Sequence, residues 1–420
     1  MRLTVDGATI DDTHNLLSNL TNEYNINIRP AFDQLIPVNV TVQMYLKSIM
    51  EIDEVKGTLS FTTGFVMVWE DYRLEWEPSQ YGGLEHVSIP LKQISFPKLI
   101  LSSPATDRSY ITQTWSRARI YSNGQVSYLE GVMIESTCDV NVKYYPFDIQ
   151  FCNTSFVSLG YTKTEMNLIR MAESIDLTLY LGNSMWDLES THASVETILA
   201  TGGENQEMLF TFNLRRKPEY AVVNVILPIL FLVTLNAFVF LLIPESGERV
   251  GYSITTLLAI AVDMTIIMSS LPKSSDPTPL IFYKLLVDLI YSALIMVIVI
   301  LNMRLHGKDD NVPVPKSLVS FYLALTCKEC GGKPVSPESG GFTKDQIANG
   351  LEESKGKLHE YDIPDNLSMN SVDAQKVTWK KLSSLLDTIF FVLFVCLSVI
   401  SFAVFVAILK GGAIATTSAV

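Results

Sequence analysis

Four long apolar runs in the second half of the chain constrain its fold most strongly. They cover residues 219–243, 250–271, 280–303 and 386–409, and each is close to the ~20 residues that cross a bilayer core as an α-helix. Pro228 lies inside the first run, where a membrane helix tolerates it because neighbouring groups satisfy the freed carbonyl. The sequence therefore predicts a membrane protein with four spanning helices.

The second run differs from the others because polar side chains interrupt it. Polar groups are costly in hydrocarbon, so a helix exposed to lipid would not carry them. We therefore expect this helix to be shielded from lipid. The polar residues are Ser253, Thr255, Thr256, Asp263, Thr265, Ser269 and Ser270.

The first half of the chain has the pattern of β-strands. Residues 38–43 alternate between apolar and polar, as a half-buried strand does, and residues 59–69, 115–121, 126–135 and 208–214 are similar. Asn123-Gly124 favours a hairpin between two of these runs, because both residues tolerate positive φ. Repeated strands without intervening helices predict a β-sandwich or barrel, preceded by one short helix within residues 9–24.

Three sequons bear on the topology of the chain. Asn19, Asn39 and Asn153 fit the N-glycosylation acceptor pattern, which also arises by chance. Cys138 and Cys152 lie in the same half, with 13 residues between them. Together these features favour a lumenal or extracellular first half, and we expect the chain in the plasma membrane. Four spans then return the C-terminus to the side of the N-terminus, so we expect both termini outside.

The start of the chain and the segment between the third and fourth runs carry further indications. The first residues form no apolar signal segment, so we expect that one has been removed. Residues 305–384 are polar, which indicates a disordered cytoplasmic linker, with amphipathic helices near 315–326 and 371–386. Cys327 and Cys330 in this segment could supply at most two of the four ligands of a zinc site, so we interpret them as reduced or lipid-modified thiols. No cofactor or metal is indicated.

Composition and motifs exclude several classes of function. The formal net charge of −13 argues against a nucleic-acid partner, which needs a basic surface. The acidic charge either keeps the domain soluble or concentrates cations near a pore. The five histidines are scattered, and no nucleotide-binding, hydrolase or metalloprotease motif is present, so we expect no enzyme.

The segment from Cys138 to Cys152 carries the most specific motif. It encloses Tyr145-Pro146-Phe147-Asp148 and resembles the namesake loop of the pentameric ligand-gated ion-channel (Cys-loop receptor) family. Further segments resemble the same family, nearest its cation-selective nicotinic and serotonin-receptor-like branch. They are residues 69–76 (W-x-D-x-x-L-x-W in the family), 224–228, 244–250 and 271–281.

The resemblance implies a fold and an assembly. The expected fold class is a β-sandwich extracellular domain plus a four-helix transmembrane bundle, with a disulfide between Cys138 and Cys152. Identical or related subunits would form a pentamer around a central pore, in contact with membrane lipid. The expected parts are an extracellular ligand-binding domain (1–217), three transmembrane helices (218–304), the cytoplasmic linker (305–384), a fourth helix (385–410) and an extracellular tail (411–420).

The resemblance also implies residues that transmit ligand binding to the pore. A salt bridge between Arg216 and the acids Asp53 or Glu54 would be the link. The complete set of expected coupling residues is Asp53, Glu54, Pro146, Phe147, Asp148, Arg216 and Pro279.

Helical spacing in the second apolar run defines one stripe of residues. In five copies around an axis, Leu258 and Val262 would form a hydrophobic constriction that closes by dewetting. Glu248 would form a ring of carboxylates at the cytoplasmic mouth and favour cations, although the helix dipole alone also favours an acid there. The expected pore-lining residues are Glu248, Gly251, Thr255, Leu258, Val262, Ile266 and Ser269.

The agonist pocket departs from the family pattern. Receptors for amines hold a cation within aromatic rings, but the matching positions here carry Gly64, Ser102 and Leu159. We therefore expect neither acetylcholine nor serotonin as agonist, and either an apolar or amphiphilic ligand or none. A non-conducting accessory subunit of a heteromeric receptor is the alternative. The expected pocket residues are Gly64, Val66, Ser102, Leu129, Leu159 and Tyr161.

Three charges lie within the apolar runs. Intramembrane charges are normally paired, so we expect Asp263 to pack near Lys284 or Asp288. Two carboxylates in one site would make the channel sensitive to pH, whereas a static neutralised pair would not, and the static pair is the better supported of the two.

Overall fold

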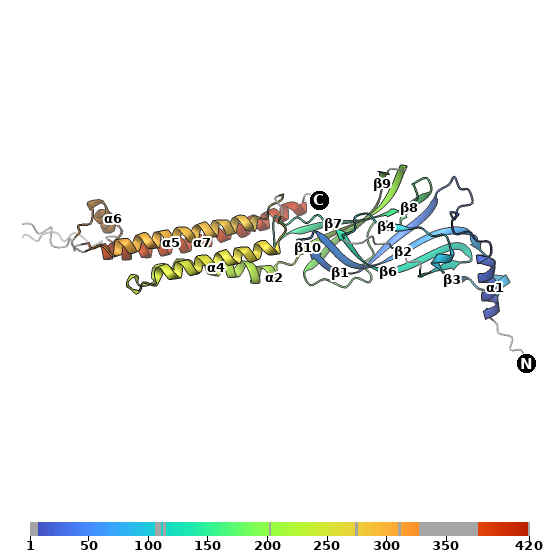
Figure 1. Cartoon of the computed structure of the whole chain (residues 1–420), viewed down its shortest axis with the longest axis horizontal. Coiled ribbons are helices and arrows are strands. Elements are labelled where there is room, and N and C mark those ends of the chain that lie inside the picture. The colour runs from blue at the N-terminus through green and yellow to red at the C-terminus, as the bar shows by residue number, and fades with distance from the viewer. Residues whose placement is uncertain are drawn as a thin grey trace, which may run out of the picture. The chain divides into compact units, whose positions relative to one another are not determined.

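The computed structural model describes residues 7–105, 111, 115–200, 203–273, 276–309, 312–326 and 377–418 (Figure 1). The chain divides into two compact units. One contains residues 1–232, 258–290 and 399–420, and the other contains residues 233–257 and 291–398.

The described part of the first half folds into two β-sheets. One sheet has the strand order β3-β5-β6-β2-β1-β8, and the other has the order β4-β7-β10-β9. The strands are β1 (Val38–Asp53), β2 (Thr58–Glu75), β3 (His86–Pro90), β4 (Leu99–Leu101), β5 (Arg117–Tyr121), β6 (Asn123–Thr137), β7 (Ile149–Ser158), β8 (Met166–Arg170), β9 (Trp186–Ala200) and β10 (Gly203–Arg216).

Aromatic side chains join the two sheets into a sandwich. Along β2, residues 59–69 alternate between buried and half-buried, and Phe61 and Phe65 are completely buried. The ring of Phe61 lies 5.0 Å from that of Phe212 in β10, and the ring of Phe65 lies 5.0 Å from that of Phe156 in β7. These contacts between facing sheets confirm the predicted β-sandwich.

The predicted N-terminal helix is also present, as α1 (Ile10–Thr21). Thr9 and Asp12 form a capping box, in which each side chain bonds to the backbone N–H of the other residue. Leu16 and Leu20 are buried on one face of the helix. The expected hairpin lies at Asn123-Gly124, where Gly124 has φ of 79°.

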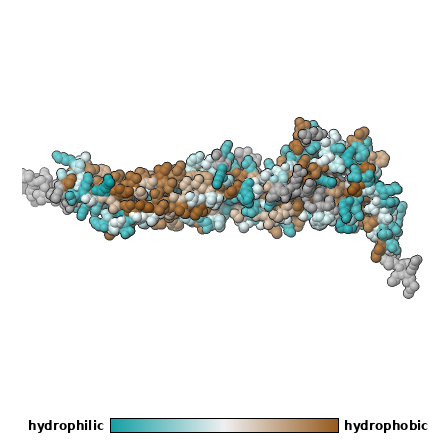
Figure 2. Space-filling view, viewed as in Figure 1, coloured by the Kyte–Doolittle hydropathy of each residue, from teal (hydrophilic) through white to brown (hydrophobic). Residues whose placement is uncertain are grey.

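The second half contains helices long and apolar enough to span a membrane, and Figure 2 shows hydrophobic residues gathered over α5 and α7. Residues 219–241 form a continuous helical segment of α2 (Glu219–Ala221), a π-helical turn (Val222–Ile226), α3 (Leu227–Ala237) and a 3₁₀ turn (Phe238–Leu241). The π-helical turn immediately precedes α3 and its Pro228, a local adjustment that membrane helices make around proline. The other spanning helices are α4 (Arg249–Ser270), α5 (Leu280–His306) and α7 (Trp379–Ser418).

The fourth spanning helix differs from its predicted bounds. Helix α7 begins at Trp379, before the expected start at 385, and continues to Ser418 through most of the expected tail. The amphipathic segment near 371–386 is therefore, from residue 379 on, the first part of α7, and residues 371–376 lie outside the described residues. The amphipathic segment near 315–326 forms a separate helix, α6 (Lys316–Thr326).

Candidate functional site

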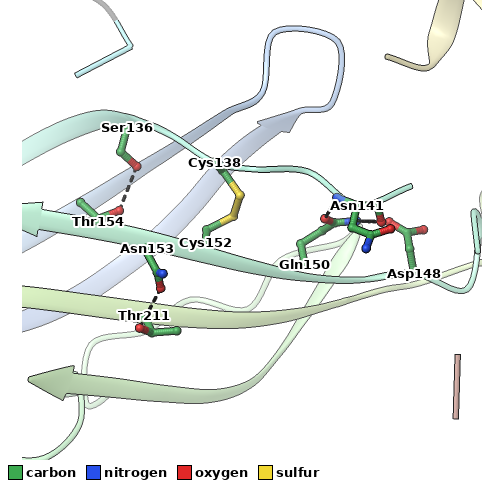
Figure 3. Close-up of a disulfide and its surroundings, with 9 residues drawn as sticks. All are labelled: Ser136, Cys138, Asn141, Asp148, Gln150, Cys152, Asn153, Thr154 and Thr211. Atoms are coloured by element: carbon green, nitrogen blue, oxygen red, sulfur yellow. Dashed lines mark hydrogen bonds between the residues drawn. A yellow bond between two sulfur atoms is a disulfide. The ribbon is translucent and has the colours of Figure 1, made fainter. Parts of the chain in front are cut away.

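The loop between β6 and β7 is closed by the disulfide that the resemblance implied, between Cys138 and Cys152 (Figure 3). Beside it, the hydroxyls of Ser136 and Thr154 lie 2.9 Å apart. Within the loop, Gln150 donates to the backbone carbonyl of Asn141 at 3.0 Å and accepts from its backbone N–H at 2.8 Å. These bonds fix the loop on both sides of its tip.

The end of β10 carries a buried arginine that joins this loop to the turn after β1. The Nε and Nη2 atoms of Arg216 donate to Asp148 at 2.8 and 3.1 Å, and Nη2 also lies 2.7 Å from Glu54. The guanidinium packs over the ring of Trp186 at 4.2 Å, and only 6% of Arg216 is exposed. The contact with Glu54 confirms the expected salt bridge, and Asp148 is a second carboxylate partner whose pairing with Arg216 was not predicted. Asp53 is the exception, because it pairs with the exposed Lys56 instead.

The same loop contacts helical segments of its own unit. The backbone N–H of Leu280, the first residue of α5 and the neighbour of Pro279, donates to the carbonyl of Lys143 at 3.0 Å. The ammonium of Lys410 in α7 lies 5.9 Å from the ring centre of Phe147, while Pro146 is buried. The loop thus touches the start of one spanning helix and the last part of another, which is the placement that transmission of a movement requires.

Helix α4 has one buried and one exposed face. Arg249, Ser253, Thr256, Ile260 and Ile267 are buried. The apolar residues of the predicted stripe are exposed, with 59% of Leu258, 56% of Val262 and 57% of Ile266 accessible. Gly251, Thr255 and Ser269 lie on the same exposed face, and the exposed Glu248 immediately precedes the helix. One side of an otherwise apolar helix therefore presents an ordered series of acidic, small, hydroxyl and apolar side chains.

The charges in α5 are arranged differently from the prediction for Asp263. Lys284 forms its ion pair with Asp288, one turn further along the same helix. Oδ2 of Asp263 is buried and has no hydrogen-bond partner among the described residues. No ion pair joins Asp263 to Lys284 among the described residues, because the i,i+4 spacing within α5 already gives the lysine a partner in Asp288. The expected packing of Asp263 near Lys284 or Asp288 stays a prediction.

Five of the six predicted pocket residues fall into two groups on different parts of the sandwich. Gly64, Val66 and Leu129 lie on the outward face of β2 and β6, where Val66 pairs with Leu129. Leu159 follows the end of β7 and is 38% exposed, and the backbone N–H of Ser102 at the end of β4 donates to Ser155 of β7. The second group thus belongs to the other sheet.

Tyr161 belongs to neither exposed group. It packs against the hydrophobic core and lines a cavity of about 10 Å³ with Trp69 and Phe96, room for about one water molecule. The aromatic ring expected to remain in the pocket therefore faces the interior.

Two polar clusters were not predicted. Tyr24, Asp71 and Arg73 form one cluster, in which both Nε and Nη2 of Arg73 donate to the completely buried Asp71 at 2.9 Å. Arg249, Asn302 and Asp387 form the other, in the membrane-spanning helices. For the second cluster, the signal available in the sequence was a polar residue within an apolar run, namely Asn302 and Asp387.

The remaining expectations concern modification and metal binding. Asn19, Asn39 and Asn153 are exposed, as glycosylation requires, and glycosylation itself stays a prediction. Cys327, Cys330 and most of the linker lie outside the described residues. Within the described ranges, no cluster of His, Cys, Asp or Glu side chains has the composition of a metal site.

Comparison with known proteins agrees with this arrangement. The neurotransmitter-gated ion-channel ligand binding domain matches residues 13–218, and the neurotransmitter-gated ion-channel transmembrane region matches residues 225–330. The chain is 28% identical over 367 residues to the neuronal acetylcholine receptor subunit alpha-3 of Homo sapiens, covering 84% of this chain and 72% of the relative. It is 26% identical over 357 residues to the alpha-6 subunit of the same organism, with the same coverage.

The two matched regions meet at the junction where Arg216, the disulfide loop and the first helical segment come together. They leave out residues 1–12, 219–224 and 331–420, and the last of these ranges includes α7. The first match covers both β-sheets and the disulfide loop, and the second covers α3, α4, α5 and α6. The chain belongs to the neurotransmitter-gated ion-channel family, as a ligand-gated ion channel of the nicotinic receptor type and not an enzyme.

Proposed function

We propose that the chain is one subunit of a pentameric, cation-selective channel in the plasma membrane, with both termini outside the cell. The exposed face of α4 is the observation that carries this proposal. A single helix cannot enclose a pore, so several copies must place this face around one axis. Five copies follow from the family, and identical or related subunits would supply them.

The apolar part of the stripe would act as the gate. Leu258, Val262 and Ile266 are each more than half exposed on the same face. In a ring, such side chains exclude water when the pore is narrow and admit it when the helices tilt or turn apart. The hydroxyls of Thr255 and Ser269 lie before and after these rings and would keep the rest of the pore wet.

Glu248 would supply the selectivity for cations. Its side chain is exposed just before the first residue of α4, so five copies would place five carboxylates at one mouth of the pore. Rings of Asp or Glu attract cations and repel anions. The permeating ions are therefore cations in this proposal.

The ligand would differ from that of the acetylcholine receptor subunits to which the chain is similar. Gly64, Ser102 and Leu159 offer no aromatic ring, and Tyr161 packs toward the core. A cationic amine would find no ring to hold it at these positions. The exposed Leu129 and Leu159 favour an apolar or amphiphilic small molecule instead. Because the two groups of residues lie on different sheets, neighbouring subunits would each contribute one group.

The same non-aromatic positions favour a second candidate, an accessory subunit that contributes its pore helix to a heteromeric channel and binds no agonist itself. Expression alone and with related subunits separates the two. A current from this chain alone supports the homomeric channel, and a current that appears only with a partner supports the accessory role.

Cysteine substitution along α4 tests the pore. In a chain with Cys327, Cys330 and Cys396 replaced by serine, Leu258→Ser should wet the constriction and give a standing current. A charged thiol reagent should then change this current for cysteines at 251, 255, 262, 266 and 269. Cysteines at the buried positions 253, 256, 260 and 267 are the matched controls and should not respond. Equal responses on both faces would contradict the proposal.

A further inference from the structure

A buried ion pair stands beside the proposed selectivity ring. Arg249 follows Glu248 directly in the sequence, yet only 2% of Arg249 is exposed whereas Glu248 is exposed. Its Nη1 and Nη2 atoms donate to the two carboxylate oxygens of Asp387 in α7, both at 2.9 Å. A paired arrangement of this kind is the strongest geometry that a guanidinium and a carboxylate adopt.

Further hydrogen bonds hold the pair in place. Nε of Arg249 donates to the carbonyl of Leu242 at 2.7 Å, which satisfies a carbonyl just after the first spanning segment. Asn302 in α5 donates to Asp387 at 2.7 Å and to the carbonyl of Ser383 at 3.2 Å. The cluster thus joins residues from four spanning segments, and every carboxylate oxygen of Asp387 has a donor.

The position of this pair bears on ion selection. Five arginines beside five glutamates would cancel the negative charge of the ring if their guanidinium groups faced the pore or remained without a counterion. The observed geometry directs each guanidinium into the helix bundle and neutralises it there. The carboxylate of Glu248 then remains the uncompensated charge at the start of the exposed face.

We propose that Asp387, on the last helix and 138 residues from Arg249 in the sequence, is a residue that determines ion selectivity. It acts by neutralising and orienting Arg249, so that Glu248 sets the sign of the potential at the pore mouth. This inference rests on the cation-selective pore proposed above, and it adds a positioning residue that makes no contact with the ions.

The local potential can be measured without an agonist or a current. A chain with Cys327, Cys330 and Cys396 replaced by serine and with Glu248→Cys carries one reactive thiol at the mouth. The measured quantity is the ratio of its reaction rates with a cationic and an anionic methanethiosulfonate reagent. A unit charge about 8 Å away, screened by ordinary salt, changes this ratio about two- to threefold, and five copies change it more.

The proposal predicts a pattern of signs in this ratio. Asp387→Asn uncovers the positive charge of Arg249 and should lower the ratio by about threefold or more. Arg249→Gln leaves the negative charge of Asp387 and should raise it. The double variant removes both charges and should return the ratio to the starting value. Asp288→Asn is the control. It removes a buried, paired carboxylate on α5 that lies fourteen residues before Asn302, which places it about 21 Å along the helix from the cluster around Arg249. This variant should leave the ratio unchanged.

A purely structural role for Asp387 would lower the amount of assembled protein but leave the ratio of the assembled fraction unchanged, and that result overturns the proposal. If Asp387→Asn does not assemble, Arg249→Gln and the double variant still decide, because equal ratios in these two also overturn it. The test does not depend on conduction. A wild-type current carried by anions would refute the proposed function, whereas unchanged ratios would refute only the role of Asp387.

Discussion

Asp148 offers the sharpest test of the buried ion pairs that Arg216 forms. It is 3% exposed and accepts two hydrogen bonds from Arg216 and one from Gln150, so Asp148→Asn would turn an amide N–H₂ toward these donors. Removing one partner of a buried ion pair costs about 3–5 kcal/mol, and we expect about 3 kcal/mol because Glu54 still pairs with Arg216. Glu54 makes one contact and its side chain is 19% exposed, so Glu54→Gln should cost about 1 kcal/mol.

Thermal unfolding of the purified channel, followed by tryptophan fluorescence, measures these differences. For a domain of about 200 residues, 1 kcal/mol corresponds to about 2–4 °C. Asp148→Asn should therefore lower the midpoint by about 6–12 °C, and Glu54→Gln by about 2–4 °C. Asp53→Asn, in the same turn but paired with the exposed Lys56, is the control and should change it by less than about 2 °C. Equal shifts for Asp148→Asn and Asp53→Asn would refute the reasoning.

Three further predictions concern the β-sandwich and the helix α1 that precedes it. Cys138→Ser should lower the free energy of unfolding by about 2–5 kcal/mol and strongly reduce surface expression, measured by biotinylation. Surface expression equal to that of wild type would contradict a structural role for the disulfide. Gly124→Ala should lower the midpoint of thermal unfolding, because φ is 79° and the new Cβ would lie 2.9 Å from the carbonyl oxygen of Asp71. Gly83→Ala is the control: φ is 84° but the Cβ would meet open space, so the decrease in the midpoint should be smaller. Thr9→Ala should remove about 1 kcal/mol of capping energy and speed hydrogen exchange in α1 about fivefold. The hydrogen bonds from Thr9 hold the pKa of Asp12 below its usual value. The cap therefore stabilises α1 above the unfolded pKa of Asp12, and this stabilisation is lost as the pH falls through the lower folded pKa. Hydrogen exchange in α1 that does not depend on pH in acid, after correction for the intrinsic exchange rate, would contradict this.

The sequence predicted those features that depend on local pattern. Alternation along residues 59–69 follows directly from one face of β2 packing against Phe156 and Phe212, and the spacing of the stripe on α4 follows from helical geometry. The disulfide and the link from Arg216 to Glu54 came from the family resemblance, whereas the ion pair between Arg216 and Asp148 was not predicted. They join residues too distant in the sequence for a periodic pattern to show.

The features that the sequence did not predict are long-range polar contacts. Arg249 and Asp387 are 138 residues apart, and nothing in either apolar run indicates which charge will meet which. The ion pair of Lys284 was not predicted for the same reason, since the lysine meets Asp288 one turn away on its own helix. Helix α7 also extends beyond the predicted span at both ends, because apolar patterning indicates the membrane-crossing part of a helix and not where the helix begins and ends.

The reversal potential of the current carried by this chain tests the central claim most directly. With Leu258→Ser to open the constriction, external NaCl is diluted tenfold while the internal solution is held constant. A tenfold gradient of a univalent ion corresponds to about 59 mV, so a cation-selective pore should shift its reversal potential by close to that amount in the negative direction. Glu248→Gln should reduce the shift. A shift in the positive direction would mean that anions carry the current, and would contradict the role assigned to the exposed face of α4 and to Glu248.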